Sequence, residues 1–318
     1  HVVHIQNGIK NADYNLENIF VHPIKRFKPV KSINFLKHFI LKIKLLTKII
    51  FKKINLYEQI DDDELRIYHV YETALTKIKE YGINNVLISS PPHSLQKVGF
   101  LLKKKYGNQV NLIGDFRDLW TNADRYRMKL KYYQKRNENI ESFCFKRYDL
   151  VNFVSVGMYK SYKKPPDNYC ILENGYLFYN KLPKGQETIT DFINNQRKNN
   201  RVVLGYFGNG MISGNNTKNK YKDLGLLFEV FSENKEIATH FAIVLQGEID
   251  IRTEVPAWVT YSKFDSVVNK QVRANIKMID IALSVETEKF NANVAIGGKI
   301  YDYIAERKPI WIITPLPA

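Results

Sequence analysis

The amino-acid sequence predicts an α/β protein with two Rossmann-like, doubly wound parallel-sheet domains that face a cleft. Short runs rich in Val and Ile alternate with amphipathic helical stretches along nearly all of the 318 residues. Several of these runs are apolar throughout, which is typical of strands that are buried on both faces of a parallel sheet. The alternation is interrupted once, around residues 174–201, by a polar stretch that contains Gly and Pro. We interpret this stretch as the link between two domains.

Each predicted element follows from its local pattern. In the first half we expect strands at residues 1–5, 19–24, 85–90, 110–116 and 149–155, and helices at residues 63–81, 95–106 and 127–147. In the second half we expect strands at residues 201–208, 240–247, 258–264, 278–285 and 309–314, and helices at residues 223–234, 266–275 and 298–306. These elements predict an N-terminal domain over residues 1–175, a linker over 176–200 with one short helix, and a C-terminal domain over 201–318.

The chain is strongly basic. It has 48 Lys and Arg residues against 32 Asp and Glu residues, and its formal net charge is +16. Such a charge favours an anionic partner, which can be nucleic acid, a membrane surface or a charged substrate. A second interpretation is that Lys is abundant together with Ile, Asn and Tyr, as in proteins from AT-rich genomes.

The cysteines and the apolar segments indicate the compartment. Cys144 and Cys170 do not form a pair with metal-ligand spacing, so we expect neither a disulfide framework nor a zinc site. We expect the protein to occupy a reducing compartment. No secretory signal opens the sequence, and no uncharged apolar run is long enough to span a bilayer. We therefore expect a cytoplasmic protein.

The positive charge is concentrated near the N-terminus. Between Asn18 and Tyr57 the sequence has no Asp or Glu but ten Lys or Arg residues. Within this region, residues 31–55 predict an amphipathic helix whose basic face comprises Lys37, Lys44, Lys48 and Lys52. The pattern fits a helix that lies in the interface of an anionic membrane, on the inner face of the cell membrane. A helix that packs on the protein core and exposes a basic back fits it equally well.

Loops that follow the strands of the first half carry candidate catalytic residues, because ligands of open parallel sheets bind beyond the carboxyl ends of the strands. His93 lies in the segment SSPPHS, and its alternative interpretation is a solvated residue beside an ordinary Pro-Pro turn. The segment GDFRDLW contributes Asp115, Arg117 and Asp118. Two acids that bracket an arginine at a strand end need a pairing partner or a ligand. The alternative here is a structural Arg–Asp pair that fixes the loop.

The second half carries candidate residues for binding a phosphate-bearing ligand. Gly208 lies in the segment GYFGNG, where small residues let the backbone approach a ligand closely. Gly297, Gly298 and Lys299 stand at the start of a predicted helix, where exposed amides and the positive end of the helix dipole attract an anion. Asp302 comes about one turn later, where its carboxylate can accept hydrogen bonds from ribose hydroxyls. The alternatives are a mobile surface loop at Gly208 and a simple strand cap at Gly297 and Gly298.

Together these segments resemble those of GT-B glycosyltransferases, in the large retaining group called family 4. GKIYDYIAERKPIWII is similar to their nucleotide-sugar-binding segment, SSPPHS and GDFRDLW to their acceptor-binding half, and ILENGY to the Asn-Gly turn at the entry to their linker. The resemblance covers about residues 1–315. It implies an enzyme that moves a sugar from a UDP- or GDP-linked nucleotide-sugar to a hydroxyl acceptor, with retention and without a metal or another cofactor. It also implies a glycan or lipid-linked acceptor, in cell-surface polysaccharide or lipid-linked glycan synthesis.

The resemblance assigns roles to individual residues on the donor side. Asp302 matches the carboxylate that holds the nucleotide ribose. Gly297, Gly298 and Lys299 match the end that binds the diphosphate. Lys222 is similar to the lysine that neutralises the leaving phosphate.

Other positions match the region around the transferred sugar. His93 and residues 115–118 match the wall of the first domain near the sugar and the acceptor. In the Glu-x7-Glu pattern of many members, the first Glu falls at Val294 in this sequence. Glu286 or Glu288 therefore takes that role only with a shifted geometry.

Three alternatives remain open at this point. A nucleotide-sugar 2-epimerase shares the fold and the donor, but it needs carboxylates and a His around C2 of the sugar, and the sequence offers His93 and His240 no evident carboxylate of that kind. A basic module that binds nucleic acid or a membrane would have featureless strand-end loops. The loops of this sequence carry candidate site residues instead, so we expect no nucleic-acid partner. A degenerate, inactive transferase is the third, because Asp302, Arg307 and Val294 replace the Glu, Gly and Glu that are usual in the family.

Overall fold

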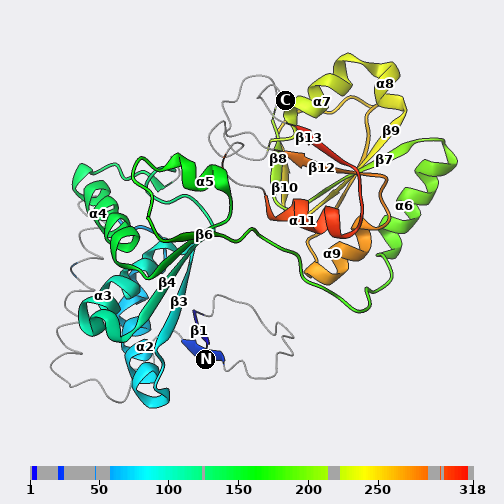
Figure 1. The fold of residues 1–318 in the computed structure, drawn as a ribbon. Helices are drawn as coiled ribbons and strands as arrows, with labels where there is room; N and C mark the ends of the chain where they lie inside the picture. The colour runs from blue at the N-terminus through cyan, green and yellow to red at the C-terminus, as the bar shows by residue number, and fades with distance from the viewer. Residues whose placement is uncertain are drawn as a thin grey trace. The chain divides into compact units, whose positions relative to one another are not determined.

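The structure is a computed structural model that describes residues 2–5, 21–24, 47, 58–123, 126–213, 223–285, 294 and 297–313. The chain divides into two compact units, His1–Leu172 and Glu173–Ala318, which we call the first and the second unit. Strands alternate with helices in both units (Figure 1). All strand pairings among the described residues are parallel, which confirms the predicted α/β fold class with parallel sheets.

The first unit contains a four-stranded sheet in the order β3-β4-β5-β6. Its strands are β3 (Asn85–Ser90), β4 (Asn111–Phe116), β5 (Leu150–Phe153) and β6 (Tyr169–Ile171). The helices α2 (Ile67–Tyr81), α3 (Gln96–Tyr106) and α4 (Lys131–Arg147) lie side by side along one side of this sheet, and the short α5 (Val156–Ser161) follows β5 (Figure 1). Two further strands, β1 (Val2–Ile5) and β2 (Val21–Ile24), pair with each other in a separate sheet.

The helices pack on one face of this sheet, so the side chains on the opposite face are not covered by them. Phe116 of β4 contacts Phe145 of α4, with ring centroids 5.3 Å apart. Gly99 lets α3 approach the same face, because a Cβ at this position would lie 2.5 Å from the Ile88 side chain. Successive side chains of a strand alternate between the two faces, so Asp115 projects from the face opposite to Phe116.

The second unit contains a five-stranded sheet in the order β11-β9-β7-β12-β13. Its strands are β7 (Val202–Phe207), β9 (Phe241–Gln246), β11 (Thr260–Phe264), β12 (Ile281–Val285) and β13 (Ile310–Ile313). Successive strands extend from β7 to β11 in one direction, and β12 and β13 continue on the other side of β7. The direction therefore reverses between β7 and β12, which is the topological switch point where open α/β sheets bind ligands.

Helices cover both faces of the second sheet (Figure 1). On one face, α7 (Gly225–Glu233) buries Phe228 against Leu204. On the other face, α6 (Glu187–Lys198), α9 (Asn269–Ile276) and α11 (Gly298–Ala305) enclose a second cluster that includes Ile193, Val203 and Tyr303. Burial on both faces explains why the strands of this unit are apolar throughout.

Most predicted elements agree with the described ones to within a few residues, and the differences are short pieces. The strands β6, β8 (Gly210–Ile212) and β10 (Ile249–Ile251) and the helices α5 and α8 (Lys235–Thr239) were not predicted. Short 3₁₀ turns cover Glu64–Arg66, His93–Leu95 and Gly107–Gln109. The helix expected in the linker is α6, and it belongs to the second unit, where Ile189 and Ile193 are fully buried. The basic helix predicted over residues 31–55 lies outside the described residues, apart from Thr47.

We expect the substitution Ile193→Ala to lower the free energy of unfolding of the second unit by about 2–5 kcal/mol, because it opens a cavity in a closed core. Urea denaturation followed by circular dichroism measures the change. Asn194→Ala on the exposed side of the same helix is the matched control and should change stability by less than about 0.5 kcal/mol. Equal effects of the two substitutions would show that α6 is only a linker helix.

Candidate functional site

The loop after β7 brings Gly208 to the switch point of the second unit. Gly208 has a φ of +121°, a region that side chains disfavour, and its amide donates to the Gln246 carbonyl at 2.7 Å. A Cβ on Gly208 would lie 2.8 Å from Nζ of Lys299. The neighbouring Gly247 is equally restricted, since a Cβ there would lie 2.5 Å from the Gly208 carbonyl oxygen. Glycine at both positions therefore lets two loops and one lysine meet.

Lys299, in the first turn of α11, has its ammonium fixed at this point. Its Nζ lies 3.9 Å from the centroid of the Tyr206 ring, a cation–π distance. Tyr206 is buried, and its hydroxyl donates to the Asn209 carbonyl at 2.7 Å. The last residues of β7 and the loop after it thus support a positive charge beside the Gly208 backbone.

Among the described residues, the start of α11 has free space beside its first residue. Gly297 precedes the helix with a β-like ψ of 136°, and Gly298 is its first residue. No described atom lies within 4 Å of a Cβ built on Gly298, so a ligand can approach the backbone there. The first amides of a helix have no partner within the helix and carry partial positive charge. Together with Lys299, they make this a place where an anion would be stabilised.

Asp302 lies on the next turn of α11 but is engaged inside the unit. Its Oδ1 lies 3.4 Å from Nη1 of Arg273 on α9, and it also accepts a hydrogen bond from Asn269. Burial raises the pKa of Asp302, and the charge of Arg273 opposes this rise. The structure places Lys299 beside the Gly208 backbone, whereas the Asp302 carboxylate has a partner on α9.

Arg273 is a functional candidate that the sequence did not reveal. It is 4% exposed, and its Nε donates to Oε1 of Glu306 at 2.8 Å while Nη1 donates to the Leu177 carbonyl at 2.9 Å. Its guanidinium also lies 5.4 Å from the centroid of the Tyr176 ring. The one sequence signal is the i, i+4 spacing of Asp302 and Glu306, which puts two carboxylates on one face of a helix.

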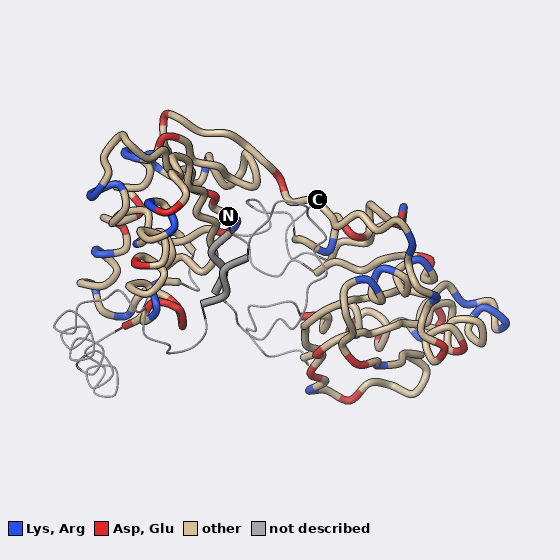
Figure 2. The backbone as a smooth tube through the Cα atoms, turned by 90° about the horizontal axis from the view of Figure 1, so that it is seen from below, with Lys and Arg blue, Asp and Glu red and all other residues tan. Residues whose placement is uncertain are grey.

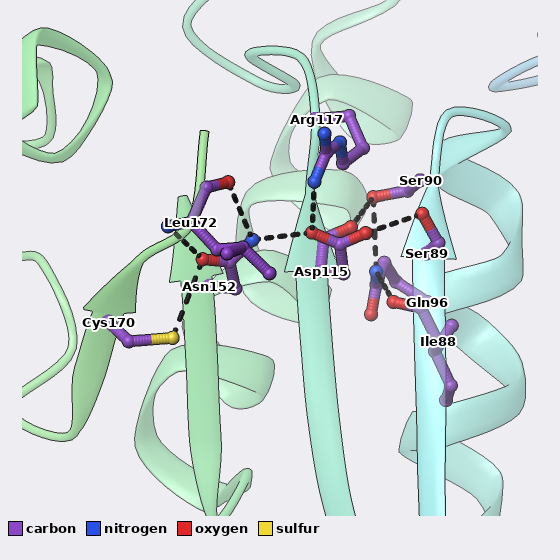
Figure 3. Close-up of polar contacts among 9 residues, drawn as sticks. All are labelled: Ile88, Ser89, Ser90, Gln96, Asp115, Arg117, Asn152, Cys170 and Leu172. Atoms are coloured by element: carbon purple, nitrogen blue, oxygen red, sulfur yellow. Dashed lines mark hydrogen bonds and ion pairs between the residues drawn. The ribbon is translucent and has the colours of Figure 1, made fainter. Parts of the chain in front are cut away.

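In the first unit, four residues in register form a row across the sheet. Ser89, Asp115, Asn152 and Cys170 are neighbours on β3, β4, β5 and β6 (Figure 3). Oδ2 of Asp115 accepts from the Ser89 hydroxyl at 2.7 Å, and Oδ1 accepts from Nδ2 of Asn152 at 2.6 Å. Oδ1 of Asn152 accepts in turn from the Leu172 amide at 2.7 Å. This row places a partly exposed carboxylate near the carboxyl end of the sheet.

The predicted neighbours of Asp115 lie in different surroundings. Nη1 of Arg117 lies 3.4 Å from Oδ1 of Asp115, which corresponds to the structural Arg–Asp pair considered above. Asp118 is half-buried in the same loop. His93 is completely buried, with its ring stacked on Trp120 at 5.5 Å and edge-on to Tyr126 at 4.6 Å. The expectation that His93 faces a cleft or solvent is thus corrected, because aromatic rings enclose it.

The loop after β4 is also tied to α4 by a buried acid that the sequence did not indicate. Glu141 accepts hydrogen bonds from the hydroxyl and the amide of Thr121 and, at 3.2 Å, from the hydroxyl of Tyr162. Burial raises the pKa of Glu141 to about 7, although these hydrogen bonds oppose the rise. Glu141 therefore holds the loop that carries Arg117 and Asp118 through a carboxyl that is protonated in mildly acidic solution.

Several predicted site residues lie outside the described residues. These are Lys222, Glu286 and Glu288 on the donor side, and Lys37, Lys44, Lys48 and Lys52 of the basic segment. Val294, where the family usually has Glu, is described and buried. Within the described ranges, no three His, Cys, Asp or Glu side chains are grouped to hold a metal ion. In the same part of the chain, no helix combines the length and the apolar character that a membrane crossing needs.

Comparison with known proteins supports the fold. No protein-family model matches the sequence, and no curated protein matches it. The structure is similar to sucrose-phosphate synthase from Thermosynechococcus elongatus, with a TM-score of 0.52 and 11% identity over 81% of this chain and 63% of the other. At this identity the likeness shows the fold, and it confirms the predicted GT-B class of two Rossmann-like domains.

Two further solved structures are similar at lower TM-scores. For α,α-trehalose 6-phosphate synthase from Burkholderia multivorans the TM-score is 0.47, at 8% identity over 85% of this chain and 65% of the other. For a putative UDP-N-acetylglucosamine 2-epimerase from Listeria monocytogenes it is 0.43, at 9% identity over 82% and 64%. The chain spans less than two thirds of the length of each of these three proteins.

We expect Gly208→Ala to lower the free energy of unfolding by about 1–3 kcal/mol, because alanine is strained at a φ of +121° and also displaces Lys299. Gly298→Ala is the matched control. Because its Cβ would enter open space at a helix start, we expect a change within about 1 kcal/mol, in the stabilising direction. Denaturant titration of both variants measures the difference, and a larger loss for Gly298→Ala would contradict this account of the loop.

We expect the stability of the first unit to fall as the pH rises from about 4.5 to about 7. In this window the unfolded chain has released the proton of Glu141 while the folded protein still holds it, so deprotonation favours unfolding. The total loss is about 3 kcal/mol. Urea titrations at several pH values should show this slope in the wild type and lose it in Glu141→Gln. Glu138→Gln, at a half-exposed position on the same helix, should keep most of the slope, because the charge of Glu138 is the smallest of the causes that act on the pKa of Glu141. An unchanged slope in Glu141→Gln would contradict the assignment.

Proposed function

We propose that this chain is a glycosyltransferase that moves a sugar from a nucleotide-sugar, UDP- or GDP-linked, to a hydroxyl group of an acceptor. The observation that carries the proposal is the Lys299 ammonium, which lies over the Tyr206 ring beside the Gly208 backbone at the switch point of the second unit. A cation placed next to the start of a helix suits the diphosphate of such a donor. The GT-B fold also supports this choice. The sequence segments that resemble glycosyltransferases predicted that fold, and the fold is confirmed.

In this proposal the second unit stabilises the leaving group. Negative charge develops on the nucleoside diphosphate as its bond to the sugar breaks. Lys299 and the first amides of α11 meet that charge without rearrangement, because Tyr206 and the Gly208 backbone already hold the lysine in place. The mechanism requires no protein nucleophile when the acceptor hydroxyl attacks the face from which the diphosphate leaves. That course retains the anomeric configuration, and the departing phosphate takes the proton of the acceptor.

In the same proposal the first unit contributes the acceptor side. The Asp115 carboxylate is held by Ser89 and Asn152 and remains partly exposed, so it can accept a hydrogen bond from a sugar hydroxyl. Arg117 and Asp118 lie in the loop that Glu141 fixes through Thr121. We propose that His93 acts through its packing on Trp120 rather than by contact with the acceptor. Its place in the site is then that of a positioning residue.

For Asp302 to bind the ribose, its carboxylate must remain able to accept a further hydrogen bond. Asp302 already interacts with Arg273 and Asn269, so a ribose would have to share the carboxylate with them. The positive charge of Arg273 also partly neutralises the Asp302 carboxylate, which weakens the hydrogen bond that the carboxylate can accept from a ribose hydroxyl. We retain Asp302 as the proposed ribose residue and add Arg273 as the residue that orients it.

The finer parts of the proposal follow from the sequence. The resemblance to retaining enzymes supports retention and catalysis without a divalent metal. The basic segment 31–55 supports an acceptor at an anionic membrane surface, in cell-surface polysaccharide or lipid-linked glycan synthesis on the inner face of the cell membrane.

We expect one class among UDP-, GDP-, ADP- and CMP-sugars to stabilise the protein in a thermal-shift screen, by about 2.7 kcal/mol at 100 times its dissociation constant. Lys299→Ala should weaken binding of that donor roughly 30-fold, which corresponds to about 2 kcal/mol for a lost charged contact. Lys277→Ala, an exposed lysine of the same unit, is the control and should leave binding unchanged. The proposal fails if no nucleotide-sugar binds, or if Lys299→Ala binds it as tightly as the wild type does.

A second measurement separates transfer from epimerisation. With UDP-N-acetylglucosamine and no acceptor, a transferase leaves the sugar configuration at C2 unchanged, and release of nucleoside diphosphate depends on added acceptor. Appearance of the C2 epimer without acceptor would favour the epimerase instead.

A further inference from the structure

A hollow of about 740 Å³ lies at the end of the first unit that is opposite to Asp115. It is formed where α3 and α4 end and where the chain enters β4, β5 and β6. Its lining includes the cations Lys103, Lys104, Lys146 and Arg147 and one carboxylate, that of Asp149. The amino ends of the strands border this hollow, whereas Asp115 lies near their carboxyl ends, so the hollow is separate from the proposed acceptor site.

The single carboxylate in the hollow is already neutralised. Oδ2 of Asp149 lies 2.8 Å from Nζ of Lys103 and also accepts from the Leu112 amide at 2.7 Å. The side chain of Lys103 is only 8% exposed, so this pair forms part of the floor. Burial raises the pKa of Asp149, but the hydrogen bonds from Lys103 and the Leu112 amide, together with the charge of Lys103, lower this pKa overall and keep the pair ionised.

The other three cations remain without a counter-charge in the described part of the chain. Lys146 and Arg147 are exposed and form no ion pair with a described residue. The Lys104 ammonium lies 4.5 Å from the centroid of the Phe100 ring, and the ring leaves its charge unneutralised. Three positive charges therefore surround a concave surface whose own acid is paired.

Cations at the end of a helix have a simpler explanation, because they stabilise the negative end of its dipole. That effect falls off within the last turn, so it acts on each helix separately and does not bring the cations of two helices together. Here the last turns of two helices direct their cations to the same hollow, and a concave surface focuses the field of such charges. Other Lys and Arg residues are spread over both units (Figure 2). The convergence on one hollow distinguishes these four from that general distribution.

We propose that this hollow binds an anion that bears phosphate groups. The planar guanidinium of Arg147 can form two parallel hydrogen bonds with a phosphate, and the lysines add point charges. The volume lies in the range of pockets that hold small ligands. Two sources offer this chemistry: the headgroup of an anionic phospholipid and a soluble phosphorylated compound. The inference is independent of the proposed sugar transfer, because none of these residues belongs to that site.

The test compares the wild type with the double substitution Lys146→Glu/Arg147→Glu. Vesicles of phosphatidylcholine alone and of phosphatidylcholine mixed with phosphatidylglycerol report on a lipid source by flotation. Inorganic pyrophosphate reports on a soluble source by isothermal calorimetry. We expect the double substitution to weaken binding of at least one phosphate probe by about tenfold or more, because each cation near a phosphate surface contributes about 1 kcal/mol.

The matched control is Lys163→Glu/Lys164→Glu, a neighbouring pair of exposed lysines in the same unit that does not line the hollow. Both variants carry the same net charge and keep the basic segment 31–55 intact, so a difference between them belongs to the hollow. Lys146→Gln/Arg147→Gln, with the same folded circular dichroism spectrum, should show a smaller loss in the same direction. Selective loss of vesicle binding supports the lipid source, and selective loss of pyrophosphate binding supports the soluble one. Equal binding by both double variants, or no binding by the wild type, would overturn the proposal.

Discussion

The reversal of strand order between β7 and β12 is the constraint on which the proposed donor site depends. Because β9 and β12 lie on opposite sides of β7, the loops that follow β7 and β12 diverge and leave a space at the carboxyl ends of these strands. Gly208 enters this space from one side, and the start of α11 enters it from the other. Two residues that are distant in the sequence, Gly208 and Lys299, therefore meet there. This topology lets Lys299, in the first turn of α11, reach the turn after β7.

A buried cation sets a second constraint in the same unit. Arg273 is nearly inaccessible to water, and the cost of burying its charge has to be offset by anionic partners and hydrogen bonds. Glu306 provides the main contact, and Asp302 and the Leu177 carbonyl provide the others. This requirement explains why Asp302 turns to α9. In the proposed function, a ribose would therefore compete with Arg273 for the same carboxylate.

Much of the fold could be predicted from local pattern, because long apolar strands and amphipathic helices leave a strong periodic signal. Short elements such as β8 and β10 leave none, since three residues cannot establish a period. Gly208 and Lys299 could be proposed because a glycine-rich turn and a basic helix start are recognisable in sequence. Arg273 and Glu141 could not, because their roles depend on burial and on partners that are distant in the chain. The burial of His93 was missed for the same reason, since the enclosing Trp120 and Tyr126 come from the next strand-end loop.

The anchoring of the Leu177 carbonyl by Arg273 has a consequence for dissecting the chain. A fragment that starts at α6 would contain every strand of the second sheet, and a boundary drawn from secondary structure alone would place it there. Such a truncation removes Tyr176, Leu177 and Tyr179. The Arg273 guanidinium then loses the carbonyl that accepts its hydrogen bond and the two aromatic rings that lie beside it. Recombinant expression of the C-terminal half should therefore begin at or before Glu173, where the compact unit itself begins. Residues that look like a tether in the sequence are, in this respect, part of the folded body.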